Sequence, residues 1–223
     1  LGFNNKGLDE VIKNLNKNRD VIIGANIGKN FFTDNEVGFK DYLKCLVGLN
    51  EYVDYFAINI SSPNTKGLRD YHDKNLLEPL LRNLLNANNS MLKPKPMLLK
   101  ISPDIDNNQL DIIIELVMDL KIDGLIATNT TISRDGLISK YKNETGGLSG
   151  LHLKNKSNKI ISYLRKKLGK NFPIIGVGGI MSAEDAIQKF ESGADLIQLY
   201  TGFIYEGPGL IKKINKLLLN ENK

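Results

Sequence analysis

The sequence predicts an α/β protein of parallel strands joined by helices, and two observations lead to this prediction. Short apolar runs rich in β-branched residues recur along the chain, separated by segments with helical apolar spacing. Polar residues and glycines follow these runs directly, as they do where parallel strands end in a ligand site. The 223 residues are 41% hydrophobic and 25% charged, which is typical of one globular domain.

Six strands are expected, in chain order, at residues 21–25, 54–60, 97–101, 124–128, 173–177 and 195–199. Because these runs are apolar almost throughout, they suit a parallel sheet covered on both faces. Helices are expected between them, since apolar residues recur at helical spacing over 77–85 and 110–120. Ser182, followed by two acidic residues, predicts a helix start, and Gly193 predicts its end.

The position of the glycines favours a barrel over an open nucleotide-binding sheet. A doubly wound fold usually has a glycine-rich phosphate turn after its first strand, and residues 26–30 lack that spacing. The Gly178-Gly179 pair instead follows the fifth run, and barrels often bind phosphate late in the chain. A closed barrel of eight units typically needs about 250 residues. We therefore expect strands three to eight of a (β/α)8 TIM barrel, with the first two strands absent from this chain.

Composition excludes several other classes of protein. The net charge is +5, but the lysines are spread along the chain, and the one tight basic trio, residues 165–167, lies on an amphipathic helix. We expect no nucleic-acid partner. The single Cys45 excludes an internal disulfide and a Cys-rich metal site, and no metal is expected. Both histidines, His72 and His152, lie in polar segments and are expected at the surface.

The run from Asn59 to Arg69 reads Asn-Ile-Ser-Ser-Pro-Asn-Thr-Lys-Gly-Leu-Arg and follows a predicted buried strand. It resembles the catalytic loop of class 2 dihydroorotate dehydrogenases, the membrane-associated, quinone-using class. The other strand ends resemble that family in the same order, over nearly the whole chain. The resemblance implies one FMN-binding β/α barrel domain over residues 1–223. It also implies oxidation of dihydroorotate to orotate in pyrimidine (UMP) biosynthesis, with FMN as hydride acceptor and quinone as final electron acceptor.

Asparagine side chains offer both a donor and an acceptor, so several of them can satisfy the polar edge of a pyrimidine ring. The resemblance implies that Ser62 is the catalytic base. Because a serine hydroxyl is a weak base, we expect it to pass the proton onward through water. The residues expected to contact the substrate are Phe3, Asn59, Asn64, Asn129 and Thr130.

A cofactor site is expected at the remaining strand ends. Lys100 lies inside an apolar run, where an ammonium needs an anionic partner, and the resemblance places it beside the flavin. Gly178 and Gly179 leave room for a phosphate at the start of the following helix. The residues expected to contact FMN are Asn26, Asn59, Lys100, Thr128, Ser149, Gly150, Gly178, Gly179, Tyr200 and Thr201.

Three alternatives remain open at this level. The first is a soluble class 1 dihydroorotate dehydrogenase that uses fumarate or NAD, although Ser62 in place of cysteine favours the quinone class. The second is a phosphate-binding barrel isomerase or lyase with Lys100 as a Schiff-base residue. The third is a non-catalytic module or inactive remnant. For the favoured class we expect dihydroorotate, orotate, quinone and a membrane surface as partners, at the bacterial or mitochondrial inner membrane. The quinone and membrane contacts are expected from a region outside this chain.

Overall fold

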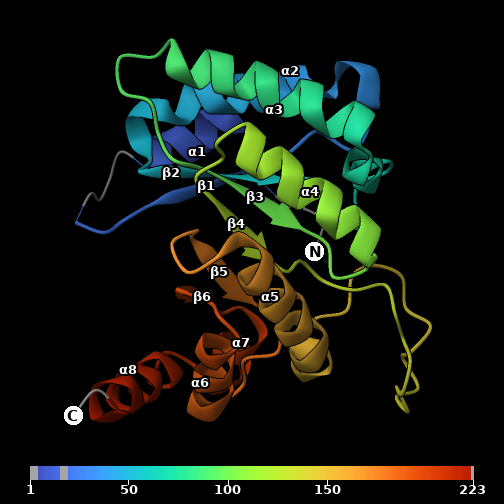
Figure 1. The fold of residues 1–223 in the computed structure, drawn as a ribbon, viewed down its shortest axis with the longest axis vertical. Coiled ribbons are helices and arrows are strands. Elements are labelled where there is room, and N and C mark those ends of the chain that lie inside the picture. Colours follow the sequence, from blue (N-terminus) through green and yellow to red (C-terminus); the bar gives the residue numbers. More distant parts are fainter. Residues whose placement is uncertain (1–4, 16–19, 222–223) are drawn as a thin grey trace. The chain divides into compact units, whose positions relative to one another are not determined.

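The computed structural model describes residues 5–15 and 20–221, and it divides into two compact units. The first unit takes residues up to 100 together with 106–123, and the second takes 101–105 and 124 onward (Figure 1). Phe3, expected to contact the substrate, lies outside the described residues. Within the described ranges, no helix is both long and apolar enough to span a membrane.

The first unit contains three parallel strands in the spatial order β1 (Gly24–Ile27), β2 (Tyr55–Asn59), β3 (Met97–Ile101). Its helices are α1 (Leu8–Leu15), α2 (Asn35–Leu49), α3 (Lys74–Asn89) and α4 (Asn107–Asp119), with 3-10 helices at Asn50–Tyr52 and Leu68–His72. Helix α2 packs on β1 and lies beside α3, which in turn contacts α4 (Figure 1).

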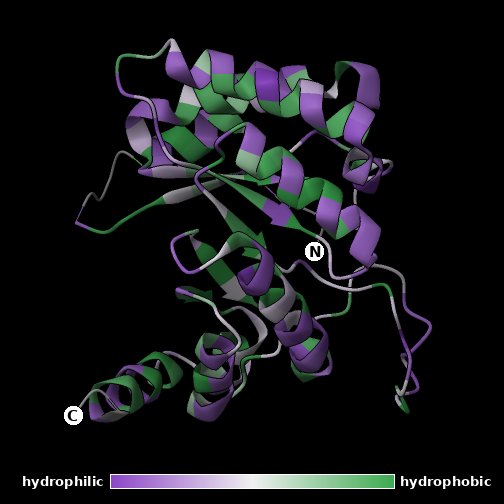
Figure 2. Cartoon of the chain, viewed as in Figure 1, coloured by the Kyte–Doolittle hydropathy of each residue, from purple (hydrophilic) through white to green (hydrophobic). Residues whose placement is uncertain are grey.

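The core of the first unit forms where the apolar sides of α2 and α3 meet the strands. Phe56 and Leu99 are fully buried on the strands, as are Leu46 on α2 and Leu81 on α3. Figure 2 shows apolar and polar residues interspersed along these helices. Burying a side chain of this size contributes about 1.5–3 kcal/mol, so this packing fixes the strands and therefore the positions of their polar ends.

The second unit has the same construction, with parallel strands in the order β4 (Gly124–Ala127), β5 (Ile174–Val177), β6 (Leu196–Gln198). Its helices are α5 (Lys154–Leu168), α6 (Ala183–Glu191), α7 (Thr201–Glu206) and α8 (Gly209–Glu221), with a 3-10 helix at Leu151–Leu153. Helix α5 packs on β4 and β5, while α6 contacts β6 and α8 (Figure 1). A cluster formed by Ile180, Ala186, Leu210 and Ile214 joins α6 to α8.

The expected α/β class is confirmed, because each of the six strands is followed by at least one helix. The expected helix start at Ser182 is also confirmed. Its hydroxyl oxygen accepts a hydrogen bond from the Asp185 backbone N–H at 3.2 Å, and the Asp185 carboxylate accepts one from the Ser182 backbone N–H at 3.1 Å. Such a reciprocal cap satisfies two backbone donors that the first helical turn leaves unpaired.

The first strand differs from its expected position. Residues 21–25 were the expected range, but pairing with β2 begins only at Gly24, opposite Tyr55. The side chains of Val21 and Ile22 are 68% and 82% exposed. Gly24 allows the Tyr55 ring to lie against the β1 backbone, where any side chain would collide with it. The start of β1 could therefore not be predicted from the apolar residues 21–23, because it depends on where β1 pairs with β2.

Candidate functional site

Three of the expected site residues in the first unit lie on one face of its strands. Asn59 is the last residue of β2 and is paired with Lys100 on β3, while Asn26 on β1 is paired with Ala57. Since side chains alternate along a strand, and Ala57 and Asn59 are two residues apart, Asn26, Asn59 and Lys100 point to the same side. This brings together, toward the carboxyl ends of the strands, two amides and one ammonium.

Asn59 is held in place from several directions. Its side-chain oxygen accepts a hydrogen bond from the Ser61 backbone at 3.1 Å, and its backbone carbonyl accepts one from the buried Tyr42 hydroxyl at 2.8 Å. The Ser61 hydroxyl lies 3.1 Å from the Asn59 side-chain oxygen and 2.8 Å from the Lys100 carbonyl oxygen. Its single proton can serve one acceptor at a time. These contacts fix Asn59 in one orientation.

Lys100 is half-buried, and burial lowers the pKa of its ammonium. Among the described residues, its ammonium has no hydrogen bond or ion pair. A buried cation without an anionic neighbour is costly. The position therefore suits a ligand that carries or develops negative charge.

Ser62 lies in the loop after β2 and is 5% exposed. Its hydroxyl oxygen accepts a hydrogen bond from the Asn64 backbone at 3.2 Å, in a local turn around Pro63. The Arg69 side chain donates from Nε to the Ser61 carbonyl at 3.1 Å and so ties the two ends of the loop together. The hydroxyl of Ser62 is thus presented by a turn whose two ends are linked.

A second set of contacts, which we call the loop clamp, consists of Lys29 and Asn35. The buried Lys29 ammonium donates to the carbonyl oxygens of Thr33 at 2.7 Å and Lys66 at 2.8 Å. The Asn35 amide donates to the Gly67 carbonyl at 2.9 Å. Burial lowers the pKa of Lys29. The loop clamp was not predicted, although a lysine two residues past a strand end is a signal that could have indicated it.

His72 corrects an expectation from sequence. It was expected at the surface but is 3% exposed, because the 3-10 helix Leu68–His72 packs its side chain into the first unit beside Leu68 and Tyr71. Its Nδ1 lies 2.7 Å from the Arg69 carbonyl oxygen, so Nδ1 carries the proton. Burial lowers the pKa of its imidazole. His152, in contrast, is exposed as expected.

In the second unit, the residues after β4 form a compact polar turn. The Asn129 backbone donates to the Ile101 carbonyl at 2.8 Å, and the Asn129 side-chain oxygen accepts from the Thr130 backbone at 2.8 Å. The Thr128 hydroxyl donates to the Asn129 carbonyl at 3.1 Å. All three expected residues of this strand end therefore lie in one short, hydrogen-bonded turn.

Asp104 fixes this turn and was not predicted. One carboxylate oxygen accepts hydrogen bonds from the Thr131 hydroxyl at 2.5 Å and the Lys156 ammonium at 2.6 Å, and the other accepts from the Ile132 backbone at 2.8 Å. Thr131 also exchanges two backbone hydrogen bonds with Leu148. Asp104 thereby links the turn after β4 to α5. Thr131 links the same turn to residues 147–150, which form a glycine-rich segment.

The glycine-rich segment meets the strand end after β6. The Thr201 hydroxyl donates to the Ser149 hydroxyl oxygen at 2.8 Å. A Cβ at Gly150 would lie 3.2 Å from the Thr201 methyl group, so a larger residue would press on Thr201. Tyr200 is 62% exposed. Ser149, Gly150 and Thr201 thus lie close together.

The turn after β5 presents backbone atoms. Gly178 and Gly179 have φ angles of 116° and 77°, which side-chain-bearing residues rarely adopt. A Cβ on Gly179 would collide with the backbone of Lys154 at the start of α5. Within the described residues, the backbone N–H groups of Gly178, Gly179 and Ile180 donate no hydrogen bond. Consecutive unpaired N–H groups in a left-handed turn bind anions, so this turn fits the phosphate of a cofactor.

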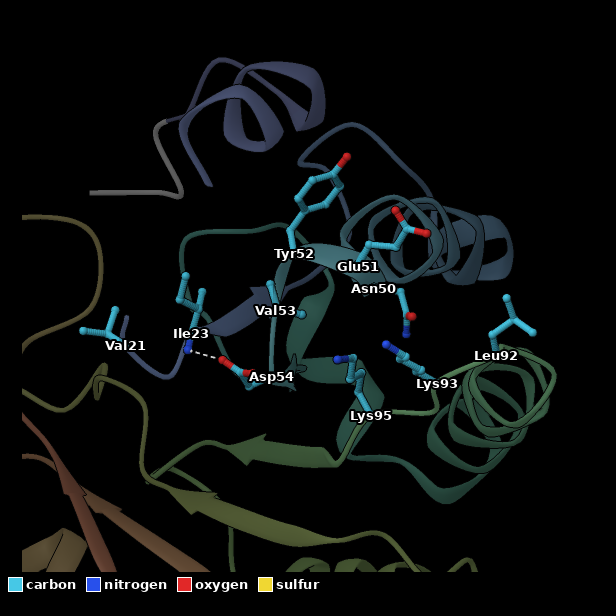
Figure 3. A pocket seen from close by; sticks show the side chains of 10 residues that line it. All are labelled: Val21, Ile23, Asn50, Glu51, Tyr52, Val53, Asp54, Leu92, Lys93 and Lys95. Carbon is cyan, nitrogen blue, oxygen red and sulfur yellow. Dashed lines mark hydrogen bonds between the residues drawn. The ribbon is translucent and has the colours of Figure 1, made fainter. Parts of the chain in front are cut away.

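The first unit also has a hollow of about 450 Å³ at the other end of its strands (Figure 3). Ile23 and Asp54, which precede β1 and β2, are joined there by a hydrogen bond of 2.8 Å from the Ile23 backbone to the Asp54 carboxylate. The residues that line it are Val21, Ile23, Asn50, Glu51, Tyr52, Val53, Asp54, Leu92, Lys93 and Lys95. Because this hollow lies at the amino ends of the strands, it contains none of the expected site residues.

Parallel strands covered by helices, with polar side chains and a glycine turn at the strand ends, are the arrangement in which α/β proteins commonly bind ligands. The chain belongs to the dihydroorotate dehydrogenase family, whose sequence pattern matches residues 1–221.

Two curated relatives named dihydroorotate dehydrogenase (quinone) show the extent of the match. The protein from Christiangramia forsetii is 54% identical over 221 residues, which are 99% of this chain and 65% of the relative. The protein from Idiomarina loihiensis is 46% identical and aligns with 96% of this chain and 66% of its own length. The chain therefore spans slightly less than two thirds of these relatives.

A solved structure, the ligand-free DHODH from Eimeria tenella, is similar to this chain with a TM-score of 0.91 and 34% identity. The similarity covers 98% of this chain and 67% of that protein. A second structure of DHODH from Eimeria tenella, in complex with ferulenol, has the same TM-score of 0.91 and 33% identity.

Proposed function

We propose that the protein to which this chain belongs oxidises dihydroorotate to orotate, with FMN as cofactor and a quinone as final electron acceptor. The observation that carries the proposal is the serine loop after β2, held beside the paired Asn59 and Lys100. Family membership and relatives named as quinone-dependent enzymes support it. The family implies a flavin cofactor in general, and FMN in particular is part of the proposal.

Ser62 is the proposed base. Forming the ring double bond of orotate removes a proton from C5 and a hydride from C6 of dihydroorotate, and FMN, when bound, accepts the hydride. The Ser62 hydroxyl oxygen is oriented by the Asn64 backbone N–H, which leaves a lone pair for the C5 proton. Since serine is a weak base, its own proton leaves through water.

Lys100 is proposed to stabilise negative charge that develops on the flavin ring. Its ammonium lies on the same face as Asn26 and Asn59 and has no anionic partner among the described residues. A fixed cation in a partly dry site stabilises charge more strongly than one in water. The amides of Asn26 and Asn59 would supply neutral hydrogen bonds to the same ring system.

Amide and hydroxyl groups are proposed to bind the pyrimidine ring. The proposed contacts are Asn59 and Asn64, at the end of β2 and in the loop that follows it, and Asn129 and Thr130, in the turn after β4. An amide side chain can both donate and accept hydrogen bonds, which matches the alternating carbonyl and N–H groups of dihydroorotate. Phe3 is part of the proposed substrate site but lies outside the described residues.

The phosphate of FMN is proposed to bind at the turn after β5. Gly178 and Gly179 offer backbone N–H groups, and the start of α6 lies just beyond them. Ser149, Gly150, Thr128, Tyr200 and Thr201 complete the proposed cofactor contacts. The Thr201–Ser149 hydrogen bond supports this grouping, because it joins two of the segments.

Quinone and a membrane surface are proposed partners of the whole protein. The names of the relatives supply the quinone. We propose that these contacts are made by a region outside this chain, at a bacterial or mitochondrial inner membrane.

The test is anaerobic addition of dihydroorotate to the whole protein while its visible flavin absorbance is recorded. The proposal expects bleaching, followed by recovery when a soluble ubiquinone analogue is added. Recovery with fumarate or NAD but not with quinone would contradict the quinone assignment. A flavin band that does not respond to dihydroorotate would contradict the substrate.

A further inference from the structure

The second unit contains a buried lysine that none of the roles above uses. Lys189 on α6 is 0% exposed, and its stem lies over the backbone of Gly176 on β5. A Cβ on Gly176 would lie only 2.5 Å from the Lys189 Cγ, so this glycine makes room for the lysine. The side chain therefore runs beneath the last residues of β5, just before the turn that holds Gly178 and Gly179.

The Lys189 ammonium is connected to that turn by a short chain of hydrogen bonds. Lys189 Nζ donates to the Ser157 hydroxyl oxygen at 3.1 Å, and the Ser157 hydroxyl donates to the Val177 carbonyl at 2.6 Å. Val177 directly precedes Gly178. Each hydrogen bond in this series orients and polarises the next group. The Lys189 ammonium therefore holds the start of the turn in place.

The charge of Lys189 is not neutralised by a contacting carboxylate. Asp185 on the same helix is paired with Lys154 of α5 at 2.9 Å and also accepts the backbone N–H groups of Met181 and Ser182. Among the described residues, Lys189 forms no ion pair. The cluster of Lys154, Asp185 and Lys189 thus carries one excess positive charge behind the turn.

An excess buried positive charge raises the free energy of the folded protein unless an anion binds nearby. A buried ammonium without a paired carboxylate disfavours the folded state. Consistent with this, burial and a smaller repulsion from Lys154 lower the pKa of Lys189 to about 8, and only the attraction of Asp185 opposes them. A ligand with two negative charges, bound to the unpaired N–H groups of the turn, would offset the cost.

We propose that Lys189 is a positioning residue that makes the turn Val177–Ile180 selective for a phosphate-bearing flavin over the same flavin without phosphate. The inference rests on the proposed function, because it takes FMN as the ligand of this turn. It adds the source of the selectivity, which is a buried charge that never touches the ligand.

The experiment measures the dissociation constants of FMN and riboflavin from flavin fluorescence, using apoprotein prepared from the whole protein. In Lys189→Met, which keeps most of the side chain's length and removes its charge, FMN binding weakens at least tenfold and riboflavin binding changes less than twofold. Ser157→Ala, which breaks the link and keeps the charge, weakens FMN binding by a smaller factor. Lys170→Met removes an exposed charge from the same unit and changes neither constant.

Equal weakening of both ligands in Lys189→Met would show a purely structural role and overturn the inference. Unchanged FMN binding would overturn it as well. Wild-type protein that binds neither flavin contradicts the proposed function itself, so the two failures are distinguishable.

If Lys189→Met does not fold, the wild-type protein provides the test. The ratio of the riboflavin to the FMN dissociation constant falls between pH 7 and pH 9.5, as Lys189 loses its proton above about pH 8. A ratio that stays constant over this range overturns the inference.

Discussion

The loop after β2 presents side chains, whereas the turn after β5 presents backbone. In the first unit, Ser62 and Asn64 lie in a loop that the side chains of Lys29, Asn35 and Arg69 hold through its carbonyl groups. In the second unit, glycines expose consecutive backbone N–H groups. The nearby charged residues Lys154, Asp185 and Lys189 lie on helices α5 and α6, outside the turn itself.

This difference reflects what each segment is proposed to bind. A pyrimidine ring and a C5 proton need particular donors, acceptors and a base, which only side chains supply. A phosphate needs several N–H groups around a compact charge, which a left-handed turn supplies without any side chain. Substitutions should therefore act directly in the loop after β2 and through geometry or charge in the turn after β5.

Ser62→Ala should give the largest effect. Because the proposed base is lost, flavin reduction by dihydroorotate should slow by about a hundredfold to ten-thousandfold, while FMN stays bound. Stopped-flow absorbance of the flavin measures this rate. Ser90→Ala, at an exposed serine of the same unit, serves as the control. Unchanged reduction kinetics in Ser62→Ala would contradict the proposal that the loop after β2 acts through its side chains.

Gly179→Ala should damage the turn after β5 through geometry. The new Cβ meets the Lys154 backbone at a φ of 77°, so we expect a loss of about 3 kcal/mol in unfolding free energy and loss of bound FMN. Gly169→Ala is a matched control, because Gly169 has the same φ of 77° with no atom within 4 Å of the new Cβ. It should cost only about 1 kcal/mol. Urea denaturation of both variants measures the difference, and equal losses would contradict the packing argument.

Lys29→Met should loosen the loop after β2 without touching the substrate. Two carbonyl oxygens lose a charged donor, so we expect about 2 kcal/mol of lost stability and a roughly tenfold lower kcat. Steady-state kinetics and urea denaturation measure these effects, with the exposed Lys40→Met as control. A normal kcat in Lys29→Met would show that the loop is positioned without the clamp.

His72 should give the smallest effect, visible as pH dependence of stability. Burial lowers its pKa below the usual 6.5, so the unfolded state binds the proton more readily. The unfolding free energy should therefore decrease as the pH falls through and below 6.5. His72→Gln should flatten this slope, and His152→Gln, at an exposed position, should not. Denaturation curves from pH 5 to 8 measure the slope, and identical slopes in wild type and His72→Gln would contradict the assignment.

Local patterns in the sequence predicted most of the elements. The range 97–101 coincides with β3, and the helix start at Ser182 is confirmed by its capping hydrogen bonds. These predictions succeed because apolar runs and capping residues act over a few neighbouring positions. The first strand was misplaced because its pairing depends on Tyr55, thirty-one positions after Gly24.

Residues of the candidate site could be proposed from sequence where the chemical group of the side chain is unusual for its position. Asn59 and Lys100 could be selected because amide and ammonium groups are unusual at the ends of apolar strands, whereas Ser62 was selected from the family resemblance. Asp104, Lys29 and Lys189 were missed, since an acidic or basic residue in a loop or helix usually faces solvent. His72 was placed at the surface for the same reason.

The sequence by itself determined the alternation of strands and helices, the polar strand ends and the glycines of the turn after β5, because each depends on the residue and its close neighbours. The tertiary structure decided which polar groups are buried and joined. Lys189 reaches Ser157, and Lys29 reaches Lys66, only because packed helices and strands bring distant positions within hydrogen-bond distance. Burial then changes the free energy of each charge, and no local pattern contains that information.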